Sequence, residues 1–208
     1  MTGGLKVAVL ASGVGSNLQA LLDTVHGVDG IEIVAVASDK PAAAALERAR
    51  AAGVEARAFP AAEFPNGGRS ERDAVMAEWL LSRGVGLVVS AGYMQLLGAE
   101  FLSAFPDRVI NVHPALLPAF PGLDAVGQAL DYGVKVFGVT VHFVDSGVDS
   151  GAVIAQRAVE LPQAREREEV LTVLHRIEHE LLPEAVRRFA RGEIRVASGH
   201  ARRVLVGP

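Results

Sequence analysis

Short apolar runs alternate with helical segments through the first half of the chain. Apolar runs of strand length lie at residues 5–10, 31–37 and 87–89, and a further short strand is expected near residues 55–59. Segments of helical character lie at residues 18–25, 42–52 and 70–83. Continuous apolar runs of this length are typical of strands that are buried on both faces of a parallel sheet. The alternation therefore predicts an α/β fold, with a doubly wound, mostly parallel central sheet of Rossmann-like type and flanking helices.

The second half continues this pattern and then ends in a different element. Strands are expected at residues 136–144 and 153–161, and helices at residues 123–132 and 166–191. Gly133 is expected to close the first of these helices, and Pro183 to interrupt or kink the second. From Gly192 onwards the sequence predicts a small exposed hairpin. Because no repeat or linker is found, we expect residues 1–208 to form a single domain.

The segment from Val109 to Gly122, VINVHPALLPAFPG, combines a strand end with polar side chains. Asn111 and His113 fall on the same side of the expected strand because side chains alternate along it, and Pro114 stops the strand because proline cannot donate to the sheet. Ligands of open α/β sheets bind at the carboxyl ends of strands, so this pair is a candidate site. The alternative is that Asn111 is a turn residue and His113 a packed strand-end histidine.

The segment ASGVGSN, residues 11–17, joins the first strand to the first helix. Ser16 or Asn17 is expected to cap that helix. The N–H groups and the positive dipole end of such a helix start attract anions, and Gly13 and Gly15 would let a phosphate approach the backbone closely. The alternative is a tight turn that binds no ligand.

Composition narrows the class of protein. The chain has 208 residues, half of them hydrophobic, and a mean hydropathy of +0.30, so it can bury a sizeable core. Its net charge is −4, so the chain lacks the excess of basic residues that is typical of nucleic-acid-binding proteins. The absence of cysteine excludes disulfides, thiolate metal sites and a cysteine nucleophile. No apolar run is long enough for a signal peptide or a membrane span, so we expect a cytoplasmic protein with no membrane partner.

Three separated segments agree with one known family. They are SGVGSNLQAL near the N-terminus, AGYMQLL with INVHPALLPAFPG in the middle, and VHFVDSGVDSG beyond them. In their order and spacing the chain resembles the phosphoribosylglycinamide formyltransferases (GAR transformylases), folate-dependent enzymes of purine biosynthesis. The resemblance implies that the formyl group of 10-formyltetrahydrofolate is transferred to the amine of glycinamide ribonucleotide, with no metal required. It also implies that residues 1–105 hold the ribonucleotide phosphate, and residues 106–208 the folate and the catalytic groups.

The resemblance assigns catalysis to Asn111, His113 and Asp149. An oxyanion forms when an amine attacks a formyl carbon, and an amide donor and a protonated imidazole can both stabilise it. Histidine is mostly neutral at neutral pH, so a nearby carboxylate is needed to favour the cation, and Asp149 supplies it. The Asp149 loop could also position a water that carries the proton from the amine to the leaving group. Taken alone, Asp149 would be an ordinary turn aspartate.

The resemblance also assigns the residues that bind the two substrates. Those for the ribonucleotide are Gly15, Ser16 and Asn17, which meet the 5′-phosphate, together with Pro114, His175 and Glu178. Those for the folate are Arg72, Met94, Gln95, Leu96, Leu97, Leu102, Asn111, Val144, Asp145, Ser146, Gly147, Val148 and Asp149. On composition alone, Arg72 is a helix-surface charge and Glu178 lies on a solvated helix face with Arg176 and Glu180.

Several positions depart from the family pattern. Gln95 stands where an arginine often occurs, and His175 stands where a glutamine is familiar. Residues 123–127 lack the histidine or basic residue that some members carry after the proline–glycine pair. The contacts made by these positions are therefore open, whereas the three catalytic residues are unaffected.

Other functions remain open on the sequence. Methionyl-tRNA formyltransferase and formyltetrahydrofolate deformylase share the same core but carry an additional domain, for which we expect no room here. A deformylase-like hydrolase and a non-catalytic folate- or nucleotide-binding module are the main alternatives. A nucleotide-dependent oxidoreductase is suggested by Asp39 after the second strand, but Leu18 replaces the third glycine of the dinucleotide fingerprint. We expect a monomer or a homodimer.

Overall fold

The computed structural model describes residues 4–197 and 203–207. The first ten elements are β1 (Leu5–Leu10), α1 (Ser16–Thr24), β2 (Ile31–Ser38), α2 (Ala44–Ala51), β3 (Glu55–Ala58), the 3₁₀ helix η1 (Ala61–Glu63), α3 (Gly68–Leu81), β4 (Leu87–Ser90), α4 (Ala99–Ala104) and β5 (Val109–His113). The others are α5 (Ala125–Tyr132), β6 (Val136–Phe143), β7 (Val153–Glu160), α6 (Arg167–Ala190), β8 (Ile194–Val196) and β9 (Val204–Val206).

The strands form a sheet in the order β3-β2-β1-β4-β5-β6-β7, and β8 and β9 form a second, two-stranded sheet. The chain divides into two compact units, Met1–Ile110 and Asn111–Pro208. The expected α/β fold with a mostly parallel central sheet and flanking helices is confirmed. The expectation of a single domain with halves at residues 1–105 and 106–208 stays a prediction.

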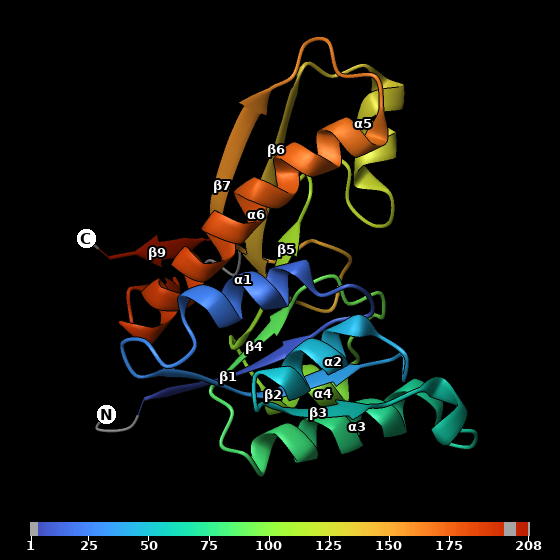
Figure 1. Cartoon of the computed structure of the whole chain (residues 1–208), viewed down its shortest axis with the longest axis vertical. Helices are drawn as coiled ribbons and strands as arrows, with labels where there is room; N and C mark the ends of the chain where they lie inside the picture. The colour runs from blue at the N-terminus through green and yellow to red at the C-terminus, as the bar shows by residue number, and fades with distance from the viewer. Residues whose placement is uncertain (1–3, 198–202, 208) are drawn as a thin grey trace. The chain divides into compact units, whose positions relative to one another are not determined.

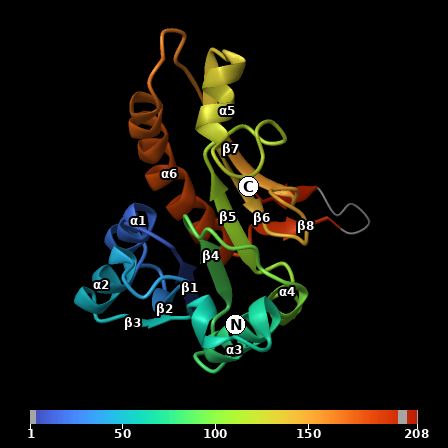
Figure 2. The ribbon, with the colours of Figure 1, turned by 90° about the vertical axis from the view of Figure 1, so that its right-hand side faces the viewer.

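In the N-terminal unit, β1 pairs in parallel with both β2 and β4, and β2 pairs in parallel with β3. Val7 to Leu10 are completely buried because β1 is an inner strand that is covered on both faces. The strand order reverses after β3, so right-handed crossovers place α1 and α2 on one face of the sheet and α3 and α4 on the other (Figures 1 and 2).

Helix starts in this unit differ from the sequence predictions. The N-cap of α1 is Gly15, in the left-handed region at φ 76°, and no side chain caps the helix. The prediction that Ser16 or Asn17 caps it is therefore wrong: the turn needs a left-handed residue at the cap position, and glycine adopts that conformation without strain. The short helix α4 has no counterpart in the predictions, because six residues with one fully buried side chain carry little periodic signal.

In the C-terminal unit, β7 pairs with β6 in antiparallel fashion, and α6 packs along both strands (Figure 1). Asp124 caps α5 by accepting a hydrogen bond from Gly127 N, and Gly133 closes the helix at φ 82°, as expected. The predicted hairpin is confirmed as β8 and β9, although residues 198–202 between them lie outside the described ranges.

Helix α6 is 24 residues long and continues through Pro183, so the prediction that the helix is interrupted at that proline is wrong. Proline removes one helical hydrogen bond, which isolated helices tolerate poorly. Here Leu181, Leu182 and Ala185 are buried around it, and their packing stabilises both halves of the helix.

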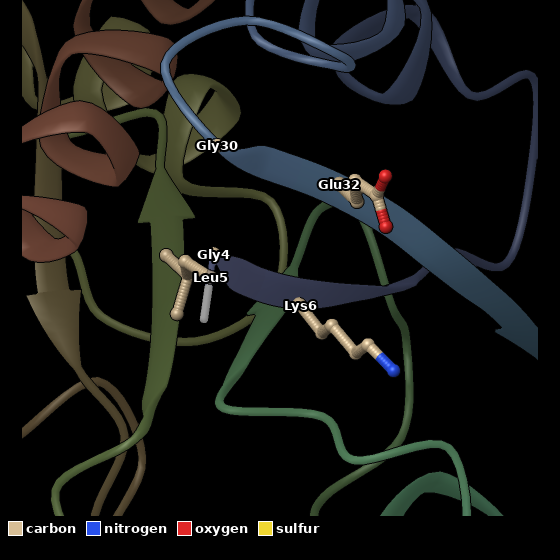
Figure 3. A pocket seen from close by; sticks show the side chains of 5 residues that line it. All are labelled: Gly4, Leu5, Lys6, Gly30 and Glu32. Carbon is tan, nitrogen blue, oxygen red and sulfur yellow. The ribbon is translucent and has the colours of Figure 1, made fainter. Parts of the chain in front are cut away.

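A cavity of about 210 Å³ lies at the amino-terminal ends of β1 and β2 (Figure 3). Gly4, Leu5, Lys6, Gly30 and Glu32 line it. Ligands of parallel α/β sheets bind instead at the carboxyl ends of the strands, so this cavity is not the candidate site. Within the described ranges, no helix has the length and apolar character that crossing a membrane requires.

Candidate active site

The three predicted catalytic residues come together in the C-terminal unit. Asn111 is the middle residue of β5 and His113 is its last residue, and Asp149 lies in the loop between β6 and β7. Asn111 Nδ2 donates to Asp149 Oδ1 at 3.4 Å, and His113 Nδ1 lies 3.4 Å from Asp149 Oδ2. Asn111 is therefore a strand residue rather than a turn residue. The alternation along β5 brings both side chains to one carboxylate, as the sequence predicts.

Backbone geometry carries the Asp149 carboxylate to this position. Asp149 has a left-handed backbone at φ 49°, and its Oδ2 accepts a hydrogen bond of 2.7 Å from Gly122 N. The loop closes at Gly151, where a Cβ atom would lie only 1.8 Å from the carbonyl oxygen of Phe143. Left-handed non-glycine residues are strained and are often found at functional sites.

The Asp149 carboxylate is held in its ionised form. Burial by itself raises the pKa of Asp149, but the hydrogen bonds with His142 and Gly122 and the charges of His113 and His142 outweigh burial. The net effect is a pKa below the ordinary value for aspartate. A negative charge therefore persists beside His113 throughout the neutral range.

His113 has both ring nitrogens directed at oxygen acceptors. Its Nε2 lies 2.8 Å from the carbonyl oxygen of Phe120, and its Nδ1 faces Asp149. A carbonyl can only accept, so Nε2 carries a hydrogen, and an imidazolium satisfies both acceptors at once. His113 is 5% exposed. It is thus packed at the strand end, with its Nε2–H directed at the Phe120 carbonyl.

His142 is a member of the cluster that the sequence reasoning missed. Its Nδ1 donates to the carbonyl oxygen of Phe143 at 2.7 Å, and its Nε2 lies 3.1 Å from Asn111 Nδ2 and 3.5 Å from Asp149 Oδ1. His142 is 2% exposed and therefore reaches the cluster from inside the protein. The sequence contains a signal that could have identified His142, because Thr140 and His142 are polar residues at alternate positions of an otherwise apolar strand.

The remaining predicted residues of this unit fall into two environments. Pro114 directly follows His113 and is half-buried, and most of the loop residues Val144 to Val148 are exposed. Within the loop, Asp145 Oδ1 accepts hydrogen bonds from Gly147 N at 3.0 Å and Ser150 Oγ at 2.7 Å, which stiffen it. This hydrogen bonding holds the loop that carries Asp149.

Glu178 and His175 both lie on α6. Glu178 is 5% exposed, so the interpretation of Glu178 as part of a solvated helix face is wrong. His175 is exposed and stacks on His179, with the ring planes at 10° and the centroids 6.3 Å apart. Their contacts with a ribonucleotide stay predictions.

The glycine turn of the N-terminal unit leads directly into α1. Gly15 packs so closely on α2 that a Cβ atom would lie 2.8 Å from Ala45 Cβ. The first hydrogen bond of α1 runs from Gln19 N to Gly15 O, so Ser16 and Asn17 lie in the first helical turn. The first N–H groups of a helix attract anions.

The predicted pterin wall comprises the loop of residues 94–97 and Leu102 on α4, both in the same unit. Met94 and Leu96 are each 55% exposed, Gln95 is exposed, and Leu97 and Leu102 are half-buried. Arg72 is 3% exposed and donates to Asp73 Oδ1 at 3.0 and 2.8 Å, so it is not an ordinary helix-surface charge. Exposed large apolar side chains on one loop are suited to a planar ligand.

Metal ligands form no cluster in the described part of the chain, where no three His, Asp or Glu side chains are grouped as a metal site requires. The expectation that no metal takes part stays a prediction.

Comparison with known proteins identifies the family of this chain. A family model described as formyl transferase matches residues 5–186. Phosphoribosylglycinamide formyltransferase from Bacillus subtilis (strain 168) is 41% identical over 185 residues, covering 88% of this chain and 94% of that protein. The enzyme of the same name from Mycobacterium tuberculosis (strain H37Rv) is 40% identical over 205 residues, covering 97% of this chain and 94% of that protein. The crystal structure of glycinamide ribonucleotide transformylase 1 from Symbiobacterium toebii has a TM-score of 0.93 and 44% identity, and covers 100% of this chain and 96% of that one. The chain belongs to the formyl transferase family.

Proposed function

We propose that this chain is a phosphoribosylglycinamide formyltransferase of de novo purine biosynthesis. It transfers the formyl group of 10-formyltetrahydrofolate to the amine of glycinamide ribonucleotide. The observation that carries the proposal is the ionised Asp149 carboxylate in contact with both Asn111 and His113. The family match and the names of relatives aligned over nearly their full length agree with it.

The reaction joins the amine nitrogen to the formyl carbon and then breaks the bond from that carbon to N10 of the folate. The amine proton ends on N10, so the leaving nitrogen departs as a neutral amine and tetrahydrofolate is released. An oxyanion develops on the formyl oxygen between these steps, and fixed donors beside it lower the barrier.

His113 is the main donor in this proposal. The formyl oxygen displaces the Phe120 carbonyl from Nε2–H, while Asp149 stays at Nδ1 and balances the positive ring. Asn111 presents its amide at the same place, and the contacts of Nδ2 with His142 and Asp149 set the orientation of that amide. The Asp149 loop would also position a water that carries the proton from the amine to N10.

The binding assignments follow the predicted residues. Gly15, Ser16 and Asn17 would hold the 5′-phosphate at the start of α1, with Pro114, His175 and Glu178 meeting the rest of the ribonucleotide. The folate would lie against Met94, Leu96, Leu97 and Leu102, with backbone groups at Gln95 and the loop of residues 144–149 reading its pterin edge. Arg72, which the resemblance assigns to the acidic tail of the folate, is 3% exposed and bound to Asp73 and to residues 95 and 96, so it would support this wall from within the protein. Action in the cytoplasm, independence of metal ions and a monomeric or dimeric state are parts of the same proposal.

The test is an assay of 10-formyltetrahydrofolate consumption with and without glycinamide ribonucleotide. We expect consumption only when the ribonucleotide is present, with one formyl group appearing on its amine for each tetrahydrofolate formed. Consumption without the ribonucleotide would identify a deformylase instead. Tight binding of both compounds without any consumption would identify a non-catalytic module.

A further inference from the structure

A continuous set of hydrogen bonds holds the loop of residues 94–98 in the N-terminal unit. Asp39, which follows β2, accepts a hydrogen bond from Ser12 Oγ with its Oδ1, and one of 3.1 Å from Gln95 Nε2 with its Oδ2. Ser12 Oγ in turn accepts a hydrogen bond of 2.8 Å from Met94 N. One carboxylate therefore joins the segments that follow β1, β2 and β4.

Arg72 holds the same loop through other atoms. Its Nη1 lies 3.4 Å from Gln95 Oε1, and its Nη2 lies 3.5 Å from the carbonyl oxygen of Leu96. The same guanidinium is paired with Asp73, whose Oδ2 accepts a hydrogen bond of 2.6 Å from Gly98 N. Arg72 and Asp73 are 3% and 0% exposed, so this anchor is part of the packed interior.

Gln95 connects Asp39 and Arg72, because both polar atoms of its side-chain amide form hydrogen bonds. Nε2 donates to the Asp39 carboxylate, and Oε1 accepts from the Arg72 guanidinium. A neutral amide matches both partners, whereas a charged side chain at position 95 would match only one of them. On either side of Gln95, the apolar side chains of Met94 and Leu96 are 55% exposed.

We propose that Asp39 and Arg72 are positioning residues for folate binding. Through Gln95 they hold residues 94–98 in one conformation, so that Met94 and Leu96 offer a preformed apolar surface to the pterin ring. A loop that is already ordered loses less conformational entropy when the ligand binds. This inference rests on the proposed function, and it assigns Asp39 a role that neither the catalytic cluster nor the phosphate turn requires.

A charge-matching experiment tests the network. Gln95→Glu places a carboxylate against Asp39, and we expect it to raise both the KM for 10-formyltetrahydrofolate and the Kd for tetrahydrofolate about tenfold. The KM for the ribonucleotide and kcat should stay within about twofold, because the catalytic cluster is untouched. Adding Asp39→Asn supplies an N–H donor to the new carboxylate and should return both folate constants to within about threefold of wild type.

Hydrogen exchange gives a readout that is independent of activity. Deuterium uptake by peptides covering residues 94–98 should rise in Gln95→Glu and fall again in the double variant. Gln163→Glu makes the same change of charge at an exposed position, and it should alter neither the folate constants nor the exchange.

The outcomes separate this inference from the proposed function. Unchanged folate constants in Gln95→Glu, or a double variant no better than Gln95→Glu, would overturn the inference while wild-type transfer persists. A wild-type protein that binds tetrahydrofolate but transfers no formyl group would overturn the function alone, and the Kd and exchange data would still decide the inference. Absence of tetrahydrofolate binding by the wild type would overturn both.

Discussion

Asp149 sets the orientation of both predicted oxyanion donors. It accepts hydrogen bonds from Asn111 Nδ2 and Gly122 N, and it lies within 3.5 Å of a ring nitrogen of both His113 and His142. The carboxylate therefore supplies charge to one donor and geometry to the other. A neutral side chain at position 149 would not supply this charge.

Asp149→Asn is expected to lower kcat by on the order of 100-fold or more, because the positive form of His113 loses its counter-charge. Substrate binding should largely persist, so steady-state kinetics with both substrates varied will separate kcat from the two KM values. Asp131→Asn, on the exposed surface of α5, serves as the matched control and should leave the kinetics unchanged. Wild-type turnover in the Asp149 variant would remove the carboxylate from the mechanism.

Tyr93 carries a buried hydroxyl that has no hydrogen-bond partner among the described residues. Burial raises its pKa to about 12. We expect Tyr93→Phe to leave the free energy of unfolding at neutral pH unchanged or to raise it by up to about 1 kcal/mol, because it removes an unsatisfied polar group.

The raised pKa of Tyr93 also gives this variant an alkaline signature. The folded state holds its proton longer than the unfolded chain, so wild-type stability should fall as the pH rises from 10 towards 12. Urea unfolding across this range should show a smaller fall in Tyr93→Phe. Tyr132→Phe, which alters an 81% exposed ring, is the control and should reproduce the wild-type slope. A steep loss of stability in Tyr93→Phe at neutral pH would contradict the prediction.

At the scale of elements, α1 and α6 show how a helix depends on what it packs against. The start of α1 requires Gly15 both for its backbone conformation and for its contact with Ala45 on α2. Helix α6 contains a proline in its interior and a stacked pair of histidines, the exposed His175 and the partly buried His179, and its packing on β6 and β7 stabilises it. The start of α1 and helix α6 both contain residues that are predicted to bind the ribonucleotide.

Gly15→Ala is expected to destabilise the protein by roughly 1–3 kcal/mol, because a side chain is forced into a left-handed backbone and against Ala45. Ala45→Gly in the same chain removes the contact with the Ala45 Cβ atom, but neither the contact of 2.9 Å with the Cα atom of residue 45 nor the backbone strain, so it should recover only part of the loss. Urea unfolding of the single and double variants measures this coupling. Gly13→Ala is the control, since its Cβ would meet nothing within 4 Å. Equal costs at the two glycines would contradict the packing argument.

His179 is expected to make α6 sensitive to acid. Burial lowers the pKa of His179, and the neighbouring His175 lowers it further. The unfolded chain therefore takes up this proton at a higher pH than the folded protein does, so stability should fall as the pH drops below about 6.5.

The comparison is made by urea unfolding at pH 7.5 and pH 5.5. His179→Gln should reduce the difference in unfolding free energy between the two pH values, and His175→Gln should reduce it by a smaller amount. The same acid sensitivity in wild type and in His179→Gln would show that other groups are responsible.

At the scale of the whole molecule, the elements that could be predicted were those with strong local signals. The inner stretches of β1, β2 and β4 (residues 7–10, 33–37 and 87–89) are apolar because the sheet is covered on both faces, and this apolar character can be read from the sequence. Helix α4 and the cap of α1 were missed, since short elements and left-handed turns depend on neighbours. The burial of Glu178 and Arg72 was missed for the same reason, because charged residues are normally exposed.

The sequence by itself determined the alternation of strands and helices, the placement of Asn111 and His113 on one side of a strand, and the chemistry that an amide, an imidazole and a carboxylate can perform together. These follow from local periodicity and from side-chain identity. Only the tertiary structure decided that His142 joins the cluster, that the Phe120 carbonyl holds His113, and that Asp39, Gln95 and Arg72 form one network. Such contacts join residues far apart in the chain, and their distances are set by how strands pair and loops close rather than by any neighbouring residue.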